Sequence, residues 1–117
     1  MVRETEMAAS NRQAQPEPPR SVEPVFGLDD LADAVLTLTT RDEVRRFLRD
    51  LCTLTELQAM AHRWQIAQLL DRRRLSYVEI ADEVGGSTAT VTRVAHWLRH
   101  GAGGYRLALD RLRPKSS

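Results

Sequence analysis

The segment from Leu75 to Val94 constrains the fold of this chain more than any other part, because it has the pattern of two short helices joined by a tight turn. Ser76 and Glu79 have the spacing of a capping box, in which each side chain binds a backbone N–H at a helix start. Gly85 and Gly86 supply the positive φ that a tight turn requires. Apolar residues recur at helical spacing on both sides of the glycines. They are Ile80, Ala81, Val84, Val91, Val94, Ala95 and Leu98. The segment predicts a helix-turn-helix.

The outward face of the second predicted helix suits the major groove of DNA. Either Ser87 or Thr88 can cap this helix, and its exposed side chains are short hydroxyls and methyls that allow deep entry into a groove. Arg93 can reach a phosphate or a guanine. A helical hairpin without a DNA role would share the apolar stripes but not the whole combination. The predicted DNA-contacting residues are Tyr77, Ser87, Thr88, Ala89, Thr90, Thr92 and Arg93.

The charge distribution agrees with DNA binding, although the formal net charge of the 117-residue chain is only +1. Residues 25–61 hold four Arg and seven Asp or Glu, a balance of −3, whereas residues 62–117 hold ten Arg or Lys and five acids, a balance of +5. The basic half contains the predicted helix-turn-helix, as phosphate binding would need. An accidental asymmetry of solvated faces is the alternative.

The rest of the composition indicates a single all-helical cytoplasmic domain. Cys52 is the only cysteine, which fits a reducing compartment, and no apolar run is long enough to span a membrane. Residues 1–24 hold four of the five prolines and few large apolar side chains, so we expect a disordered tail there. The folded domain is then expected over residues 25–113, with a short C-terminal tail at 114–117.

Helical periodicity continues on both sides of the helix-turn-helix, and no strand-like alternation is present. A first helix is expected from Leu28. Thr40 with Glu43 and Thr53 with Glu56 form two further capping boxes, each opening a helix. A short last helix is expected after the glycines at 101–104.

The helix after Thr53 is the longest, and it should run to about Arg74 with apolar residues on more than one side. Such a helix is buried on more than one side, which in a small chain favours a second subunit. The predicted dimer core consists of Phe47, Leu57, Ala61 and Trp64. The arginines predicted to reach phosphates are Arg63, Arg72, Arg73 and Arg74. The last three also suit the dipole at a helix C-terminus, and the two roles stay open.

With helices of this order and length, the chain resembles the Trp-repressor superfamily, in particular its small YerC/YecD-type branch. The resemblance covers about Leu28 to Leu112, and it rests on residues 51–56, Arg63, residues 77–81, the run Ser87-Thr-Ala-Thr-Val-Thr-Arg93 and Gly104-Tyr105. It implies a dimer that interlocks its N-terminal helices and the last helix, and that presents two recognition helices to double-stranded DNA.

The same resemblance implies that free tryptophan is not the effector. Arg63 and Arg93 match two arginines that sandwich the indole in the family's namesake. Val94, however, stands where that site needs glycine, and Trp97 stands where a serine binds the amino group of the ligand. We therefore expect a regulator, most simply a repressor, that does not depend on tryptophan. The sequence identifies no other small-molecule effector.

Other functions have weaker support. His96 and His100 could share a metal, but no third ligand is placed beside them, so we expect no metal and no cofactor. Nothing identifies a nucleophile with oxyanion donors, and we expect no enzyme activity. The alternative to a DNA-binding regulator is a helix-turn-helix accessory protein that contacts the transcription machinery, since Leu75–Ala81 also resembles the DNA-binding end of sigma factors.

Overall fold

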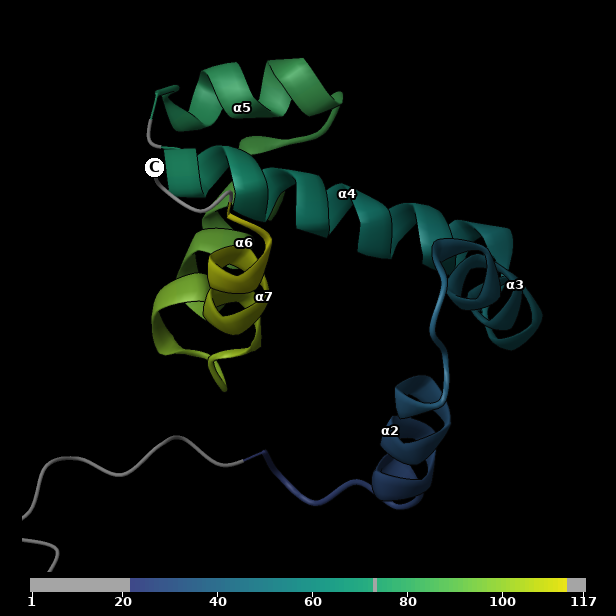
Figure 1. The fold of residues 1–117 in the computed structure, drawn as a ribbon. Coiled ribbons are helices and arrows are strands. Elements are labelled where there is room, and N and C mark those ends of the chain that lie inside the picture. The colour runs from purple at the N-terminus through teal and green to yellow at the C-terminus, as the bar shows by residue number, and fades with distance from the viewer. Residues whose placement is uncertain (1–21, 73, 114–117) are drawn as a thin grey trace, which may run out of the picture.

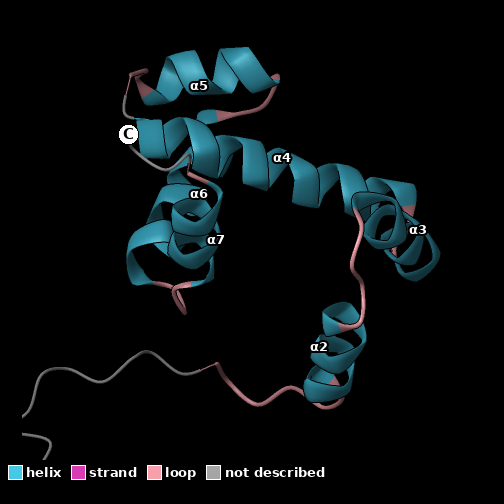
Figure 2. Cartoon of the chain, viewed as in Figure 1, coloured by secondary structure: helices cyan, strands magenta, loops and turns pink. Residues whose placement is uncertain are grey.

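The computed structural model describes residues 22–72 and 74–113, and this part of the chain is all helical with no strand (Figure 2). The helices are α2 (Leu28–Leu36), α3 (Arg41–Leu51), α4 (Leu54–Arg72), α5 (Tyr77–Val84), α6 (Thr88–His100) and α7 (Gly104–Leu112). These confirm the predicted all-α class and the expected helix order. Most of the predicted N-terminal tail, the C-terminal tail and Arg73 lie outside the described residues.

The core of the described residues lies toward the C-terminal end of α4. There α5, α6 and α7 pack around the second half of α4, whereas α3 lies at its other end and α2 lies beyond α3 (Figure 1). The fully buried cluster consists of Ile66, Ala67, Ile80, Ala81, Val91 and Val94. Small Ala67 and Ala81 let α4 and α5 approach closely, so the helix-turn-helix is built directly onto α4.

Two of the three predicted capping boxes form as expected. Ser76 and Glu79 bind each other's backbone N–H at the start of α5, and Thr53 and Glu56 do the same at the start of α4. At α3, Thr40 accepts the N–H of Glu43, but the Glu43 carboxylate accepts from the N–H and hydroxyl of Thr39 instead of closing the box. The Thr39 backbone hydrogen bond lowers the pKa of Glu43.

The turn between α5 and α6 uses its two glycines for different reasons. Gly85 has φ +75°, as the turn prediction requires. Gly86 does not have positive φ, which corrects the expectation for that residue. A Cβ on Gly86 would instead lie 2.7 Å from Nε2 of His62, so its missing side chain lets α4 approach the turn. Gly86 also donates its N–H to the Ala81 carbonyl at 2.9 Å.

Burial along α4 is uneven. Ile66 is fully buried, whereas Met60 is 40 % exposed. The second half of α4 inserts between α5, α6 and α7, but among the described helices its first half has only α3 beside it. None of the residues of α2 and α3 is buried. The residues that the structure describes therefore leave apolar surface exposed on α2, α3 and the first half of α4.

Replacing Gly85 tests the left-handed turn. A Cβ at Gly85 would meet no atom within 4 Å, so Gly85→Ala should lower the free energy of unfolding only through backbone strain, by about 1–2 kcal/mol. Gly85→Asn is the matched control. Asparagine tolerates the left-handed conformation better than alanine, so this variant should lose less of the free energy of unfolding. Urea unfolding at one fixed protein concentration measures both. Equal stability of the alanine variant and the wild type would contradict the turn geometry.

Candidate DNA-binding surface

The start of α6 forms an exposed polar surface, and its geometry follows from how the helix is capped. The Ser87 hydroxyl accepts the backbone N–H of Thr90 at 3.3 Å, which selects Ser87 over Thr88 as the cap. Val91, Val94 and Ala95 turn inward and are buried. Because these residues take up the inner face, the side chains between them project outward.

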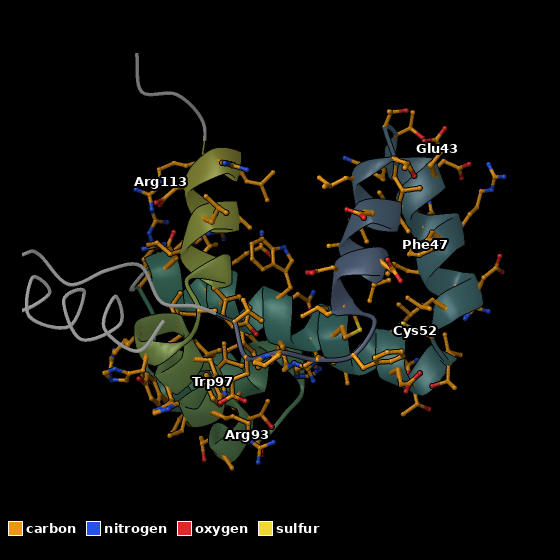
Figure 3. The ribbon with its side chains drawn as sticks, turned by 90° about the horizontal axis from the view of Figure 1, so that it is seen from below. Glu43, Phe47, Cys52, Arg93, Trp97 and Arg113 are labelled. Atoms are coloured by element: carbon orange, nitrogen blue, oxygen red, sulfur yellow. The ribbon has the colours of Figure 1, made fainter. Side chains whose placement is uncertain are left out.

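The predicted contact residues on α6 share this outward face. Thr90 is half-buried beside the cap, and the others are exposed. The exposed set is Ser87, Thr88, Ala89, Thr92 and Arg93. Figure 3 places Arg93 and Trp97 on α6, at the opposite end of α4 from Phe47 and Cys52.

Tyr77 does not join this surface directly. It is the first residue of α5, and it lines a cavity together with Ala95, Leu98 and Arg99 from the second half of α6. Its ring is half-buried against the core. The structure therefore places Tyr77 at the far end of the recognition helix from Ser87 and Thr88.

The two helices of the helix-turn-helix differ in the charge of their exposed surfaces. No acidic residue lies in the first turn of α6, so the positive end of its dipole is not neutralised there. The outer side of α5 carries the exposed carboxylates of Glu79, Asp82 and Glu83. These carboxylates would repel a phosphate backbone, so α6 is the helix suited to lie against an anionic polymer.

The arginines predicted to reach phosphates lie at different points along α4 and just after it. Arg63 follows His62, whose imidazole lies against Gly86 in the turn, and Arg63 is exposed. Arg72 and Arg74 are exposed as well, but Arg72 lies nine residues further along α4, about 14 Å at the usual helical rise. Arg63 is therefore next to the residue that contacts the turn, whereas Arg72 and Arg74 lie at and just after the C-terminal end of α4.

The described part of the chain does not fully cover the predicted dimer-core residues. Phe47, Leu57 and Trp64 are half-buried, and Ala61 is exposed. Trp64 is held partly by its own chain, because its ring stacks on Tyr105 with centroids 6.3 Å apart and planes at 15°.

Three structural contacts were not anticipated from the sequence. His62 packs against the turn, and Asp71 on α4 accepts from Arg106 on α7 and from Arg113, the residue that caps the C-terminus of α7. The Asp71 pairs join residues 35 and 42 positions apart, so no local spacing signals them. They fix α7 to the end of α4 (Figure 3 shows Arg113 at the end of α7).

Among the described residues, no group of three or more histidine, cysteine, aspartate or glutamate side chains is arranged to hold a metal ion. His96 and His100 lie with ring centroids 5.1 Å apart, and His96 meets Trp97 edge-on. No helix in the described ranges is both long and apolar enough to cross a bilayer.

Comparison with known proteins agrees with this architecture. The sequence is 42 % identical over 86 residues to the YerC protein of Bacillus subtilis (strain 168), itself uncharacterized; the match covers 74 % of this chain and 82 % of YerC. The structure matches the crystal structure of a candidate Trp repressor from Staphylococcus aureus with a TM-score of 0.72 and 37 % identity, over 83 % of this chain and 100 % of that one.

A second solved structure, of a TrpR-like protein from Eubacterium eligens ATCC 27750, matches with a TM-score of 0.70 and 33 % identity, over 80 % of this chain and 95 % of that one. The family model of the Trp repressor protein matches residues 27–113, which include all six described helices. This chain therefore belongs to the Trp repressor protein family.

Proposed function

We propose that this chain is a sequence-specific DNA-binding transcriptional regulator that acts as a homodimer in the cytoplasm, and that it is a repressor and not an enzyme. The observation that carries the proposal is the capped α6 helix, which buries Val91, Val94 and Ala95 and exposes a row of short polar side chains ending in Arg93. Membership of the Trp repressor protein family supports DNA binding as the purpose of this surface.

In this proposal α6 lies in the major groove. Its small threonine and alanine side chains allow the helix axis to come close to the base edges. Arg93 has a long, positively charged side chain that can reach a phosphate or a guanine. Arg63 contacts the phosphate backbone beside the turn, where its charge adds affinity that does not depend on sequence. The acidic outer side of α5 stays away from the phosphates.

The dimer is proposed from the uncovered apolar surface of the N-terminal half. Large apolar side chains remain exposed on α2, on α3 and on the first half of α4, among them Leu36 at 80 %, Leu51 at 52 % and Leu54 at 57 %. Apolar surface of this extent on a small protein marks an interaction site. A second copy, which carries the same surface, would cover it in a two-fold arrangement and place two α6 helices on one DNA duplex.

Repression is proposed to follow from occupancy of a promoter, without free tryptophan. Val94 is 1 % exposed and belongs to the core cluster, so a bulky side chain occupies the position where the resemblance implies glycine. Trp97 brings an indole, 54 % exposed, to the position where the resemblance implies a serine ligand.

Substitution of the recognition helix tests the groove assignment. Thr90→Ala and Arg93→Ala should each weaken binding to a preferred duplex, selected from random sequences, by about 1–3 kcal/mol, the worth of one good base or charged contact. Arg111→Ala, at an exposed site on α7, is the matched control and should bind like the wild type. A gel shift at one stated salt concentration measures all three. If the wild-type chain selects no duplex, the alternative of an accessory protein is favoured. If both variants bind the selected duplex as tightly as the wild type, the assignment of α6 to the major groove is wrong.

A charge on the uncovered half of α4 tests the dimer. Met60→Glu should give folded monomers, because Met60 is 40 % exposed in the single chain but would be buried by a second copy, where an unpaired charge is costly. Gln58→Glu, two residues away and exposed, is the control and should stay dimeric. Light scattering at micromolar concentration reports the mass. A monomeric wild type, or a dimeric Met60→Glu, would contradict the proposed interface.

Titration with L-tryptophan tests independence from the amino acid. Calorimetry should detect no saturable binding up to about 1 mM, a limit equivalent to about −4 kcal/mol. The affinity for the selected duplex should be the same with and without tryptophan. Saturable binding below that concentration, or a tryptophan-dependent gel shift, would show that Val94 and Trp97 do not close the site.

A further inference from the structure

A cavity of about 520 Å³ lies where the end of α4, the start of α5, the second half of α6 and the start of α7 meet. Its size is in the range of small-molecule sites. Its lining includes the aliphatic side chains of Leu70, Leu75 and Leu98 and the charged side chains of Asp71, Arg99 and Arg106. Arg63, Arg93, Val94 and Trp97 do not line it, so it is separate from the position implied for tryptophan.

The charges in this cavity favour an anion. Asp71 is the acidic residue in the lining, and its side chain is only 16 % exposed. Its two oxygens are each engaged by a guanidinium: Oδ1 accepts from Nη2 of Arg106 at 2.5 Å, and Oδ2 accepts from Nη2 of Arg113 at 2.9 Å. The lining holds two arginines, Arg99 and Arg106, and one carboxylate, Asp71, so its formal charge is +1.

Arg106 also has unused hydrogen-bonding capacity. Its Nε is buried, and within the described part of the chain it makes no hydrogen bond. The Asp110 carboxylate lies 3.4 Å away as an ion-pair partner, but it does not accept from Nε in hydrogen-bond geometry. A buried donor without an acceptor costs free energy, so Arg106 is less fully satisfied than Asp71, whose two oxygens both accept a hydrogen bond.

We propose that this cavity binds a small organic anion with an apolar body. The carboxylate of the ligand pairs with Arg106 and Arg99, where a planar guanidinium can bind two oxygens at once. The apolar body packs against Leu70, Leu75 and Leu98, which removes its surface from water. A simple inorganic anion would leave these three leucine side chains uncovered.

The position of the cavity links the ligand to the helix-turn-helix. Tyr77 begins α5, Leu98 and Arg99 belong to the last turns of α6, and Arg106 lies on α7, so one ligand contacts all three helices. Binding there changes how firmly α5 and α6 are held against α7. This link between the ligand and DNA rests on the proposed function. A ligand that prefers one arrangement of α6 changes the affinity of the protein for DNA, and DNA binding changes the affinity for the ligand by the same factor.

Calorimetry on the full chain without DNA tests the site, with hexanoate and 4-phenylbutanoate as probes. At least one should bind saturably with one site per chain, and the corresponding uncharged amide should bind at least about tenfold more weakly, since a charged hydrogen bond is lost. Arg99→Gln and Arg106→Gln should each weaken the binding of the anion by a similar factor. Arg111→Gln, on α7 but outside the lining, is the matched control and should bind normally.

Two measurements keep the test decisive. Circular dichroism shows whether Arg106→Gln, which also breaks the pair with Asp71, remains folded; if it does not, Arg99→Gln alone decides. No saturable binding of either acid up to millimolar concentration, equal binding of acid and amide, or wild-type affinity in Arg99→Gln would overturn the site. Gel shifts with and without the probe test separately whether the anion changes DNA affinity. If the protein binds the anion but binds no DNA, the proposed function is refuted and the assignment of the cavity still holds.

Discussion

The packing of Ile66 and Ala67 against Ile80, Val91 and Val94 is the interaction on which the rest of the structure depends. It joins α4, α5 and α6 into one body, and the outward direction of the α6 side chains follows from it. The same packing uses only the second half of α4. Within residues 22–72 and 74–113, the first half of α4, together with α2 and α3, lacks an equivalent packing partner, so a fully packed helix-turn-helix is combined with an N-terminal half whose apolar surface stays exposed. This asymmetry is the physical reason for proposing a dimer.

Much of the fold could be predicted from the sequence because its signals are local. Ser76 with Glu79, Thr53 with Glu56 and the serine before α6 mark helix starts within four residues, and the structure confirms each. Burial was harder to predict on α4, because apolar residues surround the helix and no single stripe stands out. Ile66 is buried and Met60 is not, a difference decided by which half of α4 the other helices reach.

The candidate DNA surface could be predicted in its α6 part only. Thr88, Ala89, Thr92 and Arg93 share the exposed face because the 3.6-residue period dictates it. Tyr77 needed the structure, since its position beside Leu98 and Arg99 depends on how α5 crosses α6. The ion pairs of Asp71 with Arg106 and Arg113, and the approach of His62 to Gly86, join distant parts of the chain and have no sequence spacing to reveal them.

The claim that α6 reads DNA is tested most directly by nuclear magnetic resonance of the uniformly labelled full chain, titrated with its selected duplex. The account predicts that the largest amide shift changes fall on residues 87–93 and on Arg63, with small changes at Glu79, Asp82 and Glu83. If the largest changes fall instead on the acidic side of α5 or on α2 and α3, a surface other than the recognition helix binds DNA, and the account is wrong.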